Sequence, residues 1–178
     1  MRIHKGVFLD RDGVINEDVH YLSKIEDFKL LPKVAQAIKL LNDNNFKVIV
    51  ITNQSAIARG YFGESRLWEI HKKMENELAK EGAFVDGIYY CPHHPDDDCD
   101  CRKPKPTLGL TASKKHHINL KRSFVVGDSS TDIIFGKKLG CKTVFVGDET
   151  ILVKADYVTR SLLEAVEIIL QEKMCDYK

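Results

Sequence analysis

The sequence lacks several features that would place it in whole classes of protein. Its 178 residues carry 27 Lys and Arg against 26 Asp and Glu, so the net charge of +1 gives no bulk attraction to nucleic acid or membranes. No apolar run approaches the length that spans a bilayer. No internal repeat, low-complexity stretch or interdomain linker interrupts the chain. We therefore expect a single domain, residues 1–178, with neither nucleic acid nor membrane as a partner.

The N-terminus offers no space for a signal peptide, because residues 1–6 lead directly into an apolar stretch. Cysteine is scarce: the chain has five, and three of them, Cys91, Cys99 and Cys101, share one short stretch. In a reducing cytosol such a cluster indicates metal binding rather than disulfides. We expect a cytoplasmic protein in which these cysteines hold a metal ion.

Apolar stretches of β type alternate with segments of helical periodicity. The unbroken run from Val48 to Thr52 is typical of a strand buried on both faces of a parallel sheet. The alternation predicts right-handed crossovers and a three-layer α/β/α fold with a parallel sheet. Pro32 should open the first helix, Gly140 should end the fourth, and Ser161 with Glu164 should cap the last. We expect strands near residues 6–9, 48–52, 88–90, 124–126 and 143–146.

A pair of carboxylates, Asp10 and Asp12, follows the first expected strand and precedes a turn at Gly13. Open α/β sheets bind ligands at this exit from a strand. Two carboxylates held close together repel each other unless a cation or a proton lies between them. From this stretch alone a polar turn, where aspartate is favoured by turn chemistry, explains the residues equally well.

Other polar residues follow later strands and decide between these interpretations. Thr52 ends the second strand, Lys103 lies in a later loop, and Asp128 follows the strand at 124–126. Because the carboxyl ends of parallel strands share one edge, these groups should gather beside Asp10. Carboxylates suit Mg²⁺, whereas an ammonium and a hydroxyl suit phosphate oxygens, and an aspartate can attack phosphorus. The sequence predicts a magnesium and phosphate site at this edge.

The cysteine cluster has the spacing of a structural zinc site. Three thiolates and one imidazole would complete a tetrahedron and leave no open position for catalysis. His94 is the alternative to His93 as the imidazole ligand. The metal would order a loop that runs directly into Arg102 and Lys103. From the spacing, the expected ligands are Cys91, Cys99, Cys101 and one of the two histidines, His93 or His94.

Four short motifs, in order, resemble those of the haloacid-dehalogenase-like (HAD) phosphatases. The resemblance covers about residues 6–147 and implies a HAD-like (Rossmannoid) domain. Since no long insertion separates the first two motifs, only a minimal cap is expected beside the zinc-binding loop. The motifs are Phe8-Leu9-Asp10-Arg11-Asp12-Gly13, Thr52-Asn53-Gln54-Ser55, Cys101-Arg102-Lys103-Pro104 and Gly127-Asp128.

The resemblance implies a role for each matching residue, and it favours His93 over His94 as the fourth zinc ligand. Asp10 would be the nucleophile, and Asp12 the acid that protonates the leaving group and then the base that activates water. Asp10, the backbone carbonyl of Asp12, and Asp128 would hold Mg²⁺, while Thr52 and Lys103 would bind the phosphoryl oxygens. The substrate beyond the reacting phosphate would meet Asp18, Val19, His20, Tyr21, Asn53, Gln54, Ser55 and Arg102.

Within the family the chain is similar in particular to the small D-glycero-D-manno-heptose 1,7-bisphosphate phosphatases, through its runs at 52–60 and 89–95. This implies hydrolysis of the 7-phosphate through an aspartyl-phosphate, in nucleotide-activated heptose biosynthesis for surface glycans. The short gap at 94–98 and the run at 127–133 instead resemble histidinol-phosphate phosphatases of histidine biosynthesis. The alternative from another functional class is a non-catalytic zinc-bearing binding module. Such a module would have lost a catalytic residue, whereas Asp10, Asp12, Lys103 and Asp128 are all present here. We expect a monomer that acts on a small phosphorylated molecule.

Four further residues lie in or near these motifs, and each has its own expectation. Arg11 should point away from both aspartates if strand alternation persists, which would leave it without a chemical role. Asp132 is expected as a favourable acid in the first turn of a helix. Ser129 stands where the heptose enzymes carry a lysine, and Arg59 reaches either a distal phosphate or solvent.

Overall fold

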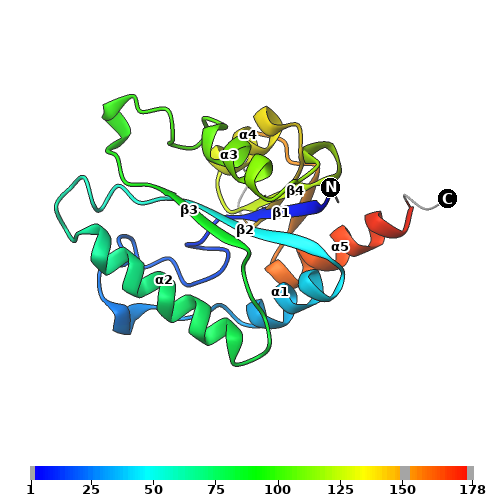
Figure 1. The fold of residues 1–178 in the computed structure, drawn as a ribbon, viewed down its shortest axis with the longest axis horizontal. Helices are drawn as coiled ribbons and strands as arrows, with labels where there is room; N and C mark the ends of the chain where they lie inside the picture. Colours follow the sequence, from blue (N-terminus) through cyan, green and yellow to red (C-terminus); the bar gives the residue numbers. More distant parts are fainter. Residues whose placement is uncertain (1–2, 149–152, 176–178) are drawn as a thin grey trace.

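A computed structural model describes residues 3–148 and 153–175 as a six-stranded parallel sheet with helices on both faces (Figure 1). The strand order is β3-β2-β1-β4-β5-β6. The strands are β1 (Lys5–Leu9), β2 (Phe46–Asn53), β3 (Gly87–Cys91), β4 (Phe124–Gly127), β5 (Lys142–Val146) and β6 (Tyr157–Thr159). The α-helices are α1 (Val34–Asp43), α2 (Glu64–Ala79), α3 (Thr107–Lys115), α4 (Ser130–Leu139) and α5 (Leu162–Cys175).

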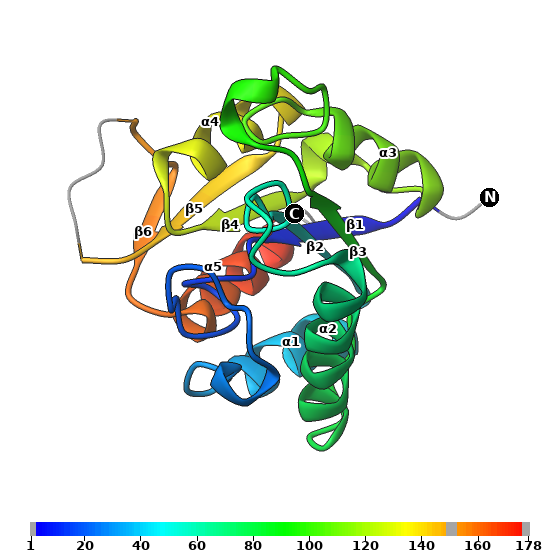
Figure 2. The same cartoon turned by 90° about the vertical axis from the view of Figure 1, so that its left-hand side faces the viewer.

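Two helical layers cover the sheet and confirm the predicted three-layer arrangement. Figure 2 shows α3 and α4 on one side, with α1, α2 and α5 on the other. Alternate side chains of β2 serve the two layers: Val48 and Val50 join the core with α1, α2 and α5. Ile49 and Ile51 join the core with α3 and α4. The run at 48–52 therefore reads as continuously apolar because both of its faces are buried.

The central position of β1 places the first motif at the middle of the sheet. Leu9, its last residue, pairs with Val50 of β2 on one side and with Val126 of β4 on the other. All three strands run in the same direction, so the residues after them leave the sheet at one edge. This register is what brings the segments that follow β1, β2 and β4 together.

Several local predictions needed correction. Helix α1 begins at Val34 rather than at Pro32, because Lys33 precedes it in the left-handed region with φ 63°. The short β6 was missed, since three residues are too few to show alternation. Gly140 ends α4 at φ 75°, as predicted. Ser161 accepts a hydrogen bond from Glu164 N at 3.2 Å, which confirms its capping role at α5.

Within residues 3–148 and 153–175, no helix combines the length and the apolar character that crossing a bilayer requires.

Candidate active site

A cavity of about 350 Å³ opens at the carboxyl edge of the sheet. It is formed by the segments that follow β1, β2 and β4, together with the end of the cysteine-rich loop after β3. Most of the predicted site residues therefore meet in one place, as expected from the shared edge of parallel strands. Those in the lining are Asp10, Asp12, Asp18, His20, Tyr21, Thr52, Asn53, Gln54, Ser55, Lys103 and Asp128.

Lys103 reaches the floor of this cavity and is only 5% exposed. Its Nζ donates to Asp10 Oδ1 at 2.8 Å, to Asp132 Oδ1 at 2.6 Å and to the Ile51 carbonyl at 2.8 Å. Burial disfavours the ammonium, but the two carboxylates hold the pKa of Lys103 above its usual value. The side chain is thus a buried cation whose three donors are all satisfied.

Asp132 has a larger part than the predicted helix-terminus acid. It lies in the first turn of α4, as expected, but its carboxylate pairs with Lys103 and is 2% exposed. Ser129, the N-cap of α4, donates its hydroxyl to Asp132 Oδ2 at 2.5 Å. This serine therefore orients a carboxylate that in turn orients the lysine.

Three carboxylates form the floor beside Lys103. Oxygen atoms of Asp10, Asp128 and Asp132 lie within 4.8 Å of one another. Burial raises the pKa of Asp10 to about 7, with Lys103 opposing and the neighbouring carboxylates adding to the rise. Burial and the charge of Asp132 raise the pKa of Asp128 to about 6. Buried oxygen donors whose charges repel each other suit Mg²⁺, which would relieve that repulsion.

Gly13 allows the loop after β1 to approach Asp128 closely. Its φ is 79°, and a Cβ added there would lie 1.9 Å from Asp128 Oδ2. No other residue type fits at that position without displacing the carboxylate. The predicted turn at Gly13 thus also serves the packing of the acidic cluster.

The expectation for Arg11 is wrong. Its guanidinium turns toward Asp12, with Nη2 at 2.9 Å from Oδ1 and 2.8 Å from Oδ2. Strand alternation does not persist here, because β1 ends at Leu9 and Arg11 O accepts from Ile15 N in a turn. Although burial opposes ionisation of Asp12, Arg11 foremost holds the pKa of that carboxyl below its usual range.

Two residues predicted to meet substrate are engaged by the protein itself. Asn53 donates Nδ2 to the Lys103 carbonyl at 3.2 Å and accepts from Lys103 N at 3.0 Å. Gln54 donates Nε2 to Asp12 Oδ2 at 3.0 Å and to Thr52 Oγ1 at 2.9 Å. Both residues line the cavity. Their side-chain amides, however, are hydrogen-bonded to Asp12, Thr52 and the backbone of Lys103, and so they position these candidate catalytic residues.

His20 and Tyr21, which line the cavity, belong to a cluster of aromatic side chains that the sequence did not indicate. His20 and Tyr21 adopt φ values of 62° and 100°, which are uncommon for residues with a side chain. The Tyr21 ring lies edge-on to Tyr61 at 5.1 Å, and Arg59 stands 5.7 Å from its centroid. Arg59 therefore contacts an aromatic face rather than solvent alone.

Two predicted substrate contacts are absent from the described cavity lining. Val19 is 43% exposed, and Arg102 directs Nη1 to the His93 carbonyl at 3.4 Å. Their proposed contacts with substrate stay predictions.

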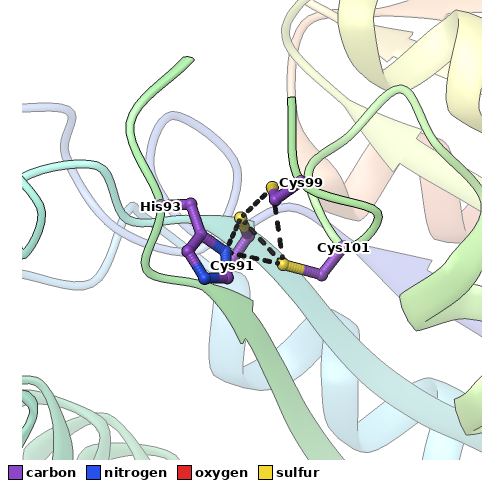
Figure 3. A group of neighbouring side chains, drawn as sticks. All are labelled: Cys91, His93, Cys99 and Cys101. Carbon is purple, nitrogen blue, oxygen red and sulfur yellow. Dashed lines mark hydrogen bonds between the residues drawn. The ribbon is translucent and has the colours of Figure 1, made fainter. Parts of the chain in front are cut away.

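The cysteine-rich loop brings its four expected ligands together (Figure 3). Cys101 Sγ lies 3.1 Å from Cys91 Sγ, 3.7 Å from Cys99 Sγ and 3.1 Å from His93 Nδ1. A tetrahedral zinc with Zn–S near 2.3 Å would space its sulfur ligands about 3.8 Å apart. The donor set therefore fits zinc, and the sulfur atoms, 3.1–3.7 Å apart, lie somewhat closer together than they would around the bound ion. His94 instead accepts from Asp96 N as the cap of a 3₁₀ turn, so His93 is the better imidazole candidate.

Known proteins match this architecture. A protein-family model described as "HAD-hyrolase-like" matches residues 100–165. A D-glycero-beta-D-manno-heptose-1,7-bisphosphate 7-phosphatase of Pasteurella multocida is 38% identical over 183 residues, covering 93% of this chain and 96% of the relative. The chain belongs to the HAD-like phosphatases. The predicted family and fold are thereby confirmed.

Two further HAD-like phosphatases agree with the first. A D-glycero-alpha-D-manno-heptose-1,7-bisphosphate 7-phosphatase of Photorhabdus laumondii is 42% identical over 149 residues, covering 80% of this chain and 81% of the relative. A solved D,D-heptose 1,7-bisphosphate phosphatase of B. bronchiseptica, complexed with magnesium and phosphate, superposes with a TM-score of 0.87. That match is 36% identical and covers 94% of this chain and 99% of the other.

Proposed function

We propose that this HAD-like phosphatase removes the 7-phosphate from a D-glycero-D-manno-heptose 1,7-bisphosphate, in a magnesium-dependent reaction. One observation carries the proposal: Asp10, Asp128 and Lys103 converge in the cavity of a chain that aligns almost end to end with named heptose bisphosphate phosphatases. A small phosphorylated molecule is the substrate class that the cavity suits, since its floor carries both a cation and metal-binding carboxylates.

The first half of the reaction transfers the phosphoryl group to the protein. An Asp10 carboxylate oxygen attacks phosphorus, and the bond from phosphorus to the sugar oxygen breaks. Asp12 donates a proton to that leaving oxygen; because Arg11 favours the ionised form of Asp12, the carboxylate takes up this proton from solvent before the step. Lys103, by exchanging one of its present acceptors for a phosphoryl oxygen, and Thr52 hold the other phosphoryl oxygens as their charge is redistributed. Asp10 is then an aspartyl-phosphate and Asp12 is a carboxylate.

The second half releases inorganic phosphate. Asp12 takes a proton from a water that attacks phosphorus, and the bond between phosphorus and the Asp10 oxygen breaks. Magnesium held by Asp10, Asp128 and the carbonyl of Asp12 would neutralise negative charge on the phosphoryl group. The two aspartates therefore do different work although they are two residues apart.

We assign the cysteine cluster a structural zinc. Three sulfurs and one nitrogen fill a tetrahedron, so no position remains for a reacting water. The last ligand, Cys101, precedes Lys103 by two residues. Zinc would order the loop that delivers this lysine to the cavity.

One side-by-side assay tests the substrate assignment. Phosphate release is measured with heptose 1,7-bisphosphate, in both anomers, and with histidinol phosphate, using Asp10→Asn as the inactive control. We expect kcat/KM to be highest for a heptose bisphosphate. A preference for histidinol phosphate would overturn the assigned substrate. If Asp10→Asn releases phosphate as fast as the unaltered protein, the activity comes from a contaminating phosphatase, and the chain is better explained as a non-catalytic zinc-bearing binding module.

We further propose that the protein works as a cytoplasmic monomer in nucleotide-activated heptose biosynthesis. Its formal net charge of +1 gives no reason for membrane attachment. Light scattering after size-exclusion chromatography measures the oligomeric state. A mass near 20.3 kDa is expected, and twice that mass would contradict it.

A further inference from the structure

Arg11 lies behind the cavity and takes no part in the steps described above. It is 0% exposed, so it cannot touch a substrate that enters the cavity. A buried guanidinium needs a partner, because an unpaired charge in the interior is very costly. Its partner is Asp12, which receives Nε at 3.2 Å as well as both contacts from Nη2. The guanidinium thus grips both oxygens of the carboxylate assigned to proton transfer.

Two amide side chains complete this grip on Asp12. Asn16 donates Nδ2 to Oδ1 at 2.9 Å, and Gln54 donates Nε2 to Oδ2 at 3.0 Å. Among the described residues, Asn16 Oδ1 is the only buried side-chain polar atom without a hydrogen-bond partner. Leaving such an atom unpaired costs about 1–3 kcal/mol. The amide is thus oriented so that Nδ2 donates both to Asp12 and to the Glu17 carbonyl, each at 2.9 Å, while Oδ1 stays unpaired.

His71 of α2 holds Arg11 from behind. Its Nε2 lies 3.3 Å from Arg11 Nη1, and the residue is 7% exposed. Burial and the neighbouring guanidinium lower the pKa of His71 to about 3, so the ring is neutral and Nε2 accepts the hydrogen bond. The ring of Tyr90 lies tilted beside that of His71, with centroids 6.1 Å apart. A chain of contacts thus runs from α2 through Arg11 to Asp12.

We propose that Arg11, held by His71, is a positioning residue that fixes the orientation of the Asp12 carboxylate for proton transfer. The proposal rests on the role given to Asp12 in the proposed function. A free carboxylate rotates about its Cβ–Cγ bond, whereas a planar guanidinium holds both oxygens in one plane. The Asp12 side chain keeps 25% exposure toward the cavity, which is where the leaving oxygen and the water must lie.

The choice of substrate separates orientation of Asp12 from general support of the fold. A sugar leaves as an alkoxide, which needs a proton from Asp12 as the bond breaks. The phenolate of p-nitrophenyl phosphate leaves without one. A loss of orientation must therefore slow phosphoryl transfer from the sugar more than from the aryl phosphate. A distorted fold slows both alike.

Arg11→Lys tests this, because it retains the charge but loses the fork. First-turnover rates are measured with heptose bisphosphate and with p-nitrophenyl phosphate. We expect the first-turnover rate with the sugar to fall about 10- to 100-fold, as part of the 10²–10⁴-fold that acid–base catalysis supplies. The sugar concentration that gives half of the maximal first-turnover rate should change little, and the first-turnover rate with the aryl phosphate should fall much less. Equal losses on both substrates, or no loss, would overturn the proposal.

Variants of His71 give a second test that does not depend on replacing a buried arginine. His71→Leu removes the acceptor and should reproduce the substrate-selective loss in weaker form, whereas His71→Gln, which retains an acceptor, should restore part of the rate. His116→Leu is the matched control, because His116 follows α3 and contacts Tyr89 rather than Arg11. Equal rates in His71→Leu and His71→Gln would contradict the proposal.

Asp12→Asn separates the failure of this inference from that of the proposed function. If Asp12→Asn slows both substrates alike, the assignment of Asp12 as the acid is wrong, and the inference fails with it. If Asp12→Asn selectively slows the sugar but the variants of Arg11 and His71 do not, Asp12 keeps its role and only the positioning inference is wrong.

Discussion

Two buried cations face the two aspartates at the end of β1, and they are built differently. Lys103 comes from a loop 93 residues away and shares one ammonium among Asp10, Asp132 and a backbone carbonyl. Arg11 is the direct neighbour of Asp12 and holds both of its oxygens in a planar fork. An ammonium is a point charge that tolerates a change of acceptors, whereas a fork imposes one geometry. The nucleophile is thus paired with an adaptable charge, and the acid–base residue with a rigid one.

The largest expected effect on activity comes from replacing Asp10, one of the two carboxylates that pair with Lys103. Asp10→Asn should lower kcat by about 10⁴-fold or more, because loss of a nucleophile removes the whole covalent route. The variant should retain its fold, since the amide has nearly the same shape. Steady-state phosphate release measures the rate and thermal unfolding checks the fold. A tenfold loss with intact folding would show that Asp10 does not attack phosphorus.

Exchanging one type of cation for the other sharpens the comparison. In Lys103→Arg the wider guanidinium must fit a space that now leaves the lysine only 5% exposed, and it cannot reproduce three converging contacts. We expect kcat to fall about 10²–10³-fold, as when one donor to a transition-state oxygen is lost. Kinetics with the heptose bisphosphate test this. Near-normal activity would mean that charge alone suffices at this position.

A change in the cysteine-rich loop should lower activity less, because this loop affects Lys103 only indirectly, by keeping the backbone that carries it ordered. Cys99→Ser should lose bound zinc and lower activity about 10- to 100-fold, the range typical of groups that support a site from outside. Metal analysis and activity are measured on the same sample. Cys141→Ala is the control, since Cys141 is buried against α3 and α4 away from the cluster. Full activity in a zinc-free Cys99→Ser variant would contradict the assigned role.

The smallest expected effect is on stability and concerns Asp156. Unlike Asp12, this carboxylate is held by hydrogen bonds from uncharged groups rather than by a guanidinium. It accepts from Thr143 N and Oγ1, both at 2.7 Å. Burial alone would raise its pKa, but these bonds hold the pKa below the usual 3.8. A lowered pKa in the folded state stabilises the fold above the unfolded value, and this contribution disappears as pH falls through the folded value.

Because Asp156 is exposed and solvent screens its charge, Asp156→Asn should destabilise the protein by only about 0.5 kcal/mol at neutral pH. The difference from the unaltered protein should narrow below pH 3.8, where Asp156 takes up a proton. Denaturant unfolding at both pH values measures this. A difference that does not depend on pH would show that the charge of Asp156 contributes nothing.

The parts of the site that follow sheet geometry could be predicted from the sequence. Asp10 and Asp128 directly follow recognisable strands and Thr52 lies near the end of another, and parallel strands bring their ends to one edge. The convergence of Cys91, His93, Cys99 and Cys101 could be predicted because their spacing is local to one loop. Lys103 could be assigned through the resemblance to a family, although its pairing with Asp132 could not.

The remaining features depend on backbone paths that sequence patterns do not encode. Arg11 was misassigned because alternation holds only inside a strand, and β1 ends two residues earlier. The role of Asn53 requires knowing that the backbone of Lys103 lies beside the end of β2. The contact of Tyr21 with Tyr61 joins two irregular loops, for which no periodicity exists.

The two-way hydrogen bond between Asn53 and Lys103 has a consequence for how this family can diversify. Gln54 N also donates to the Cys91 carbonyl at 2.8 Å, so the cysteine-rich loop is tied to the end of β2 at both of its bases. Between these ties, residues 94–98 lie inside the Cys/His cluster and can be exchanged without replacing any of its four members. Loops of different length and chemistry grafted between His93 and Cys99 would then change substrate choice while the cluster and the lysine stay in place.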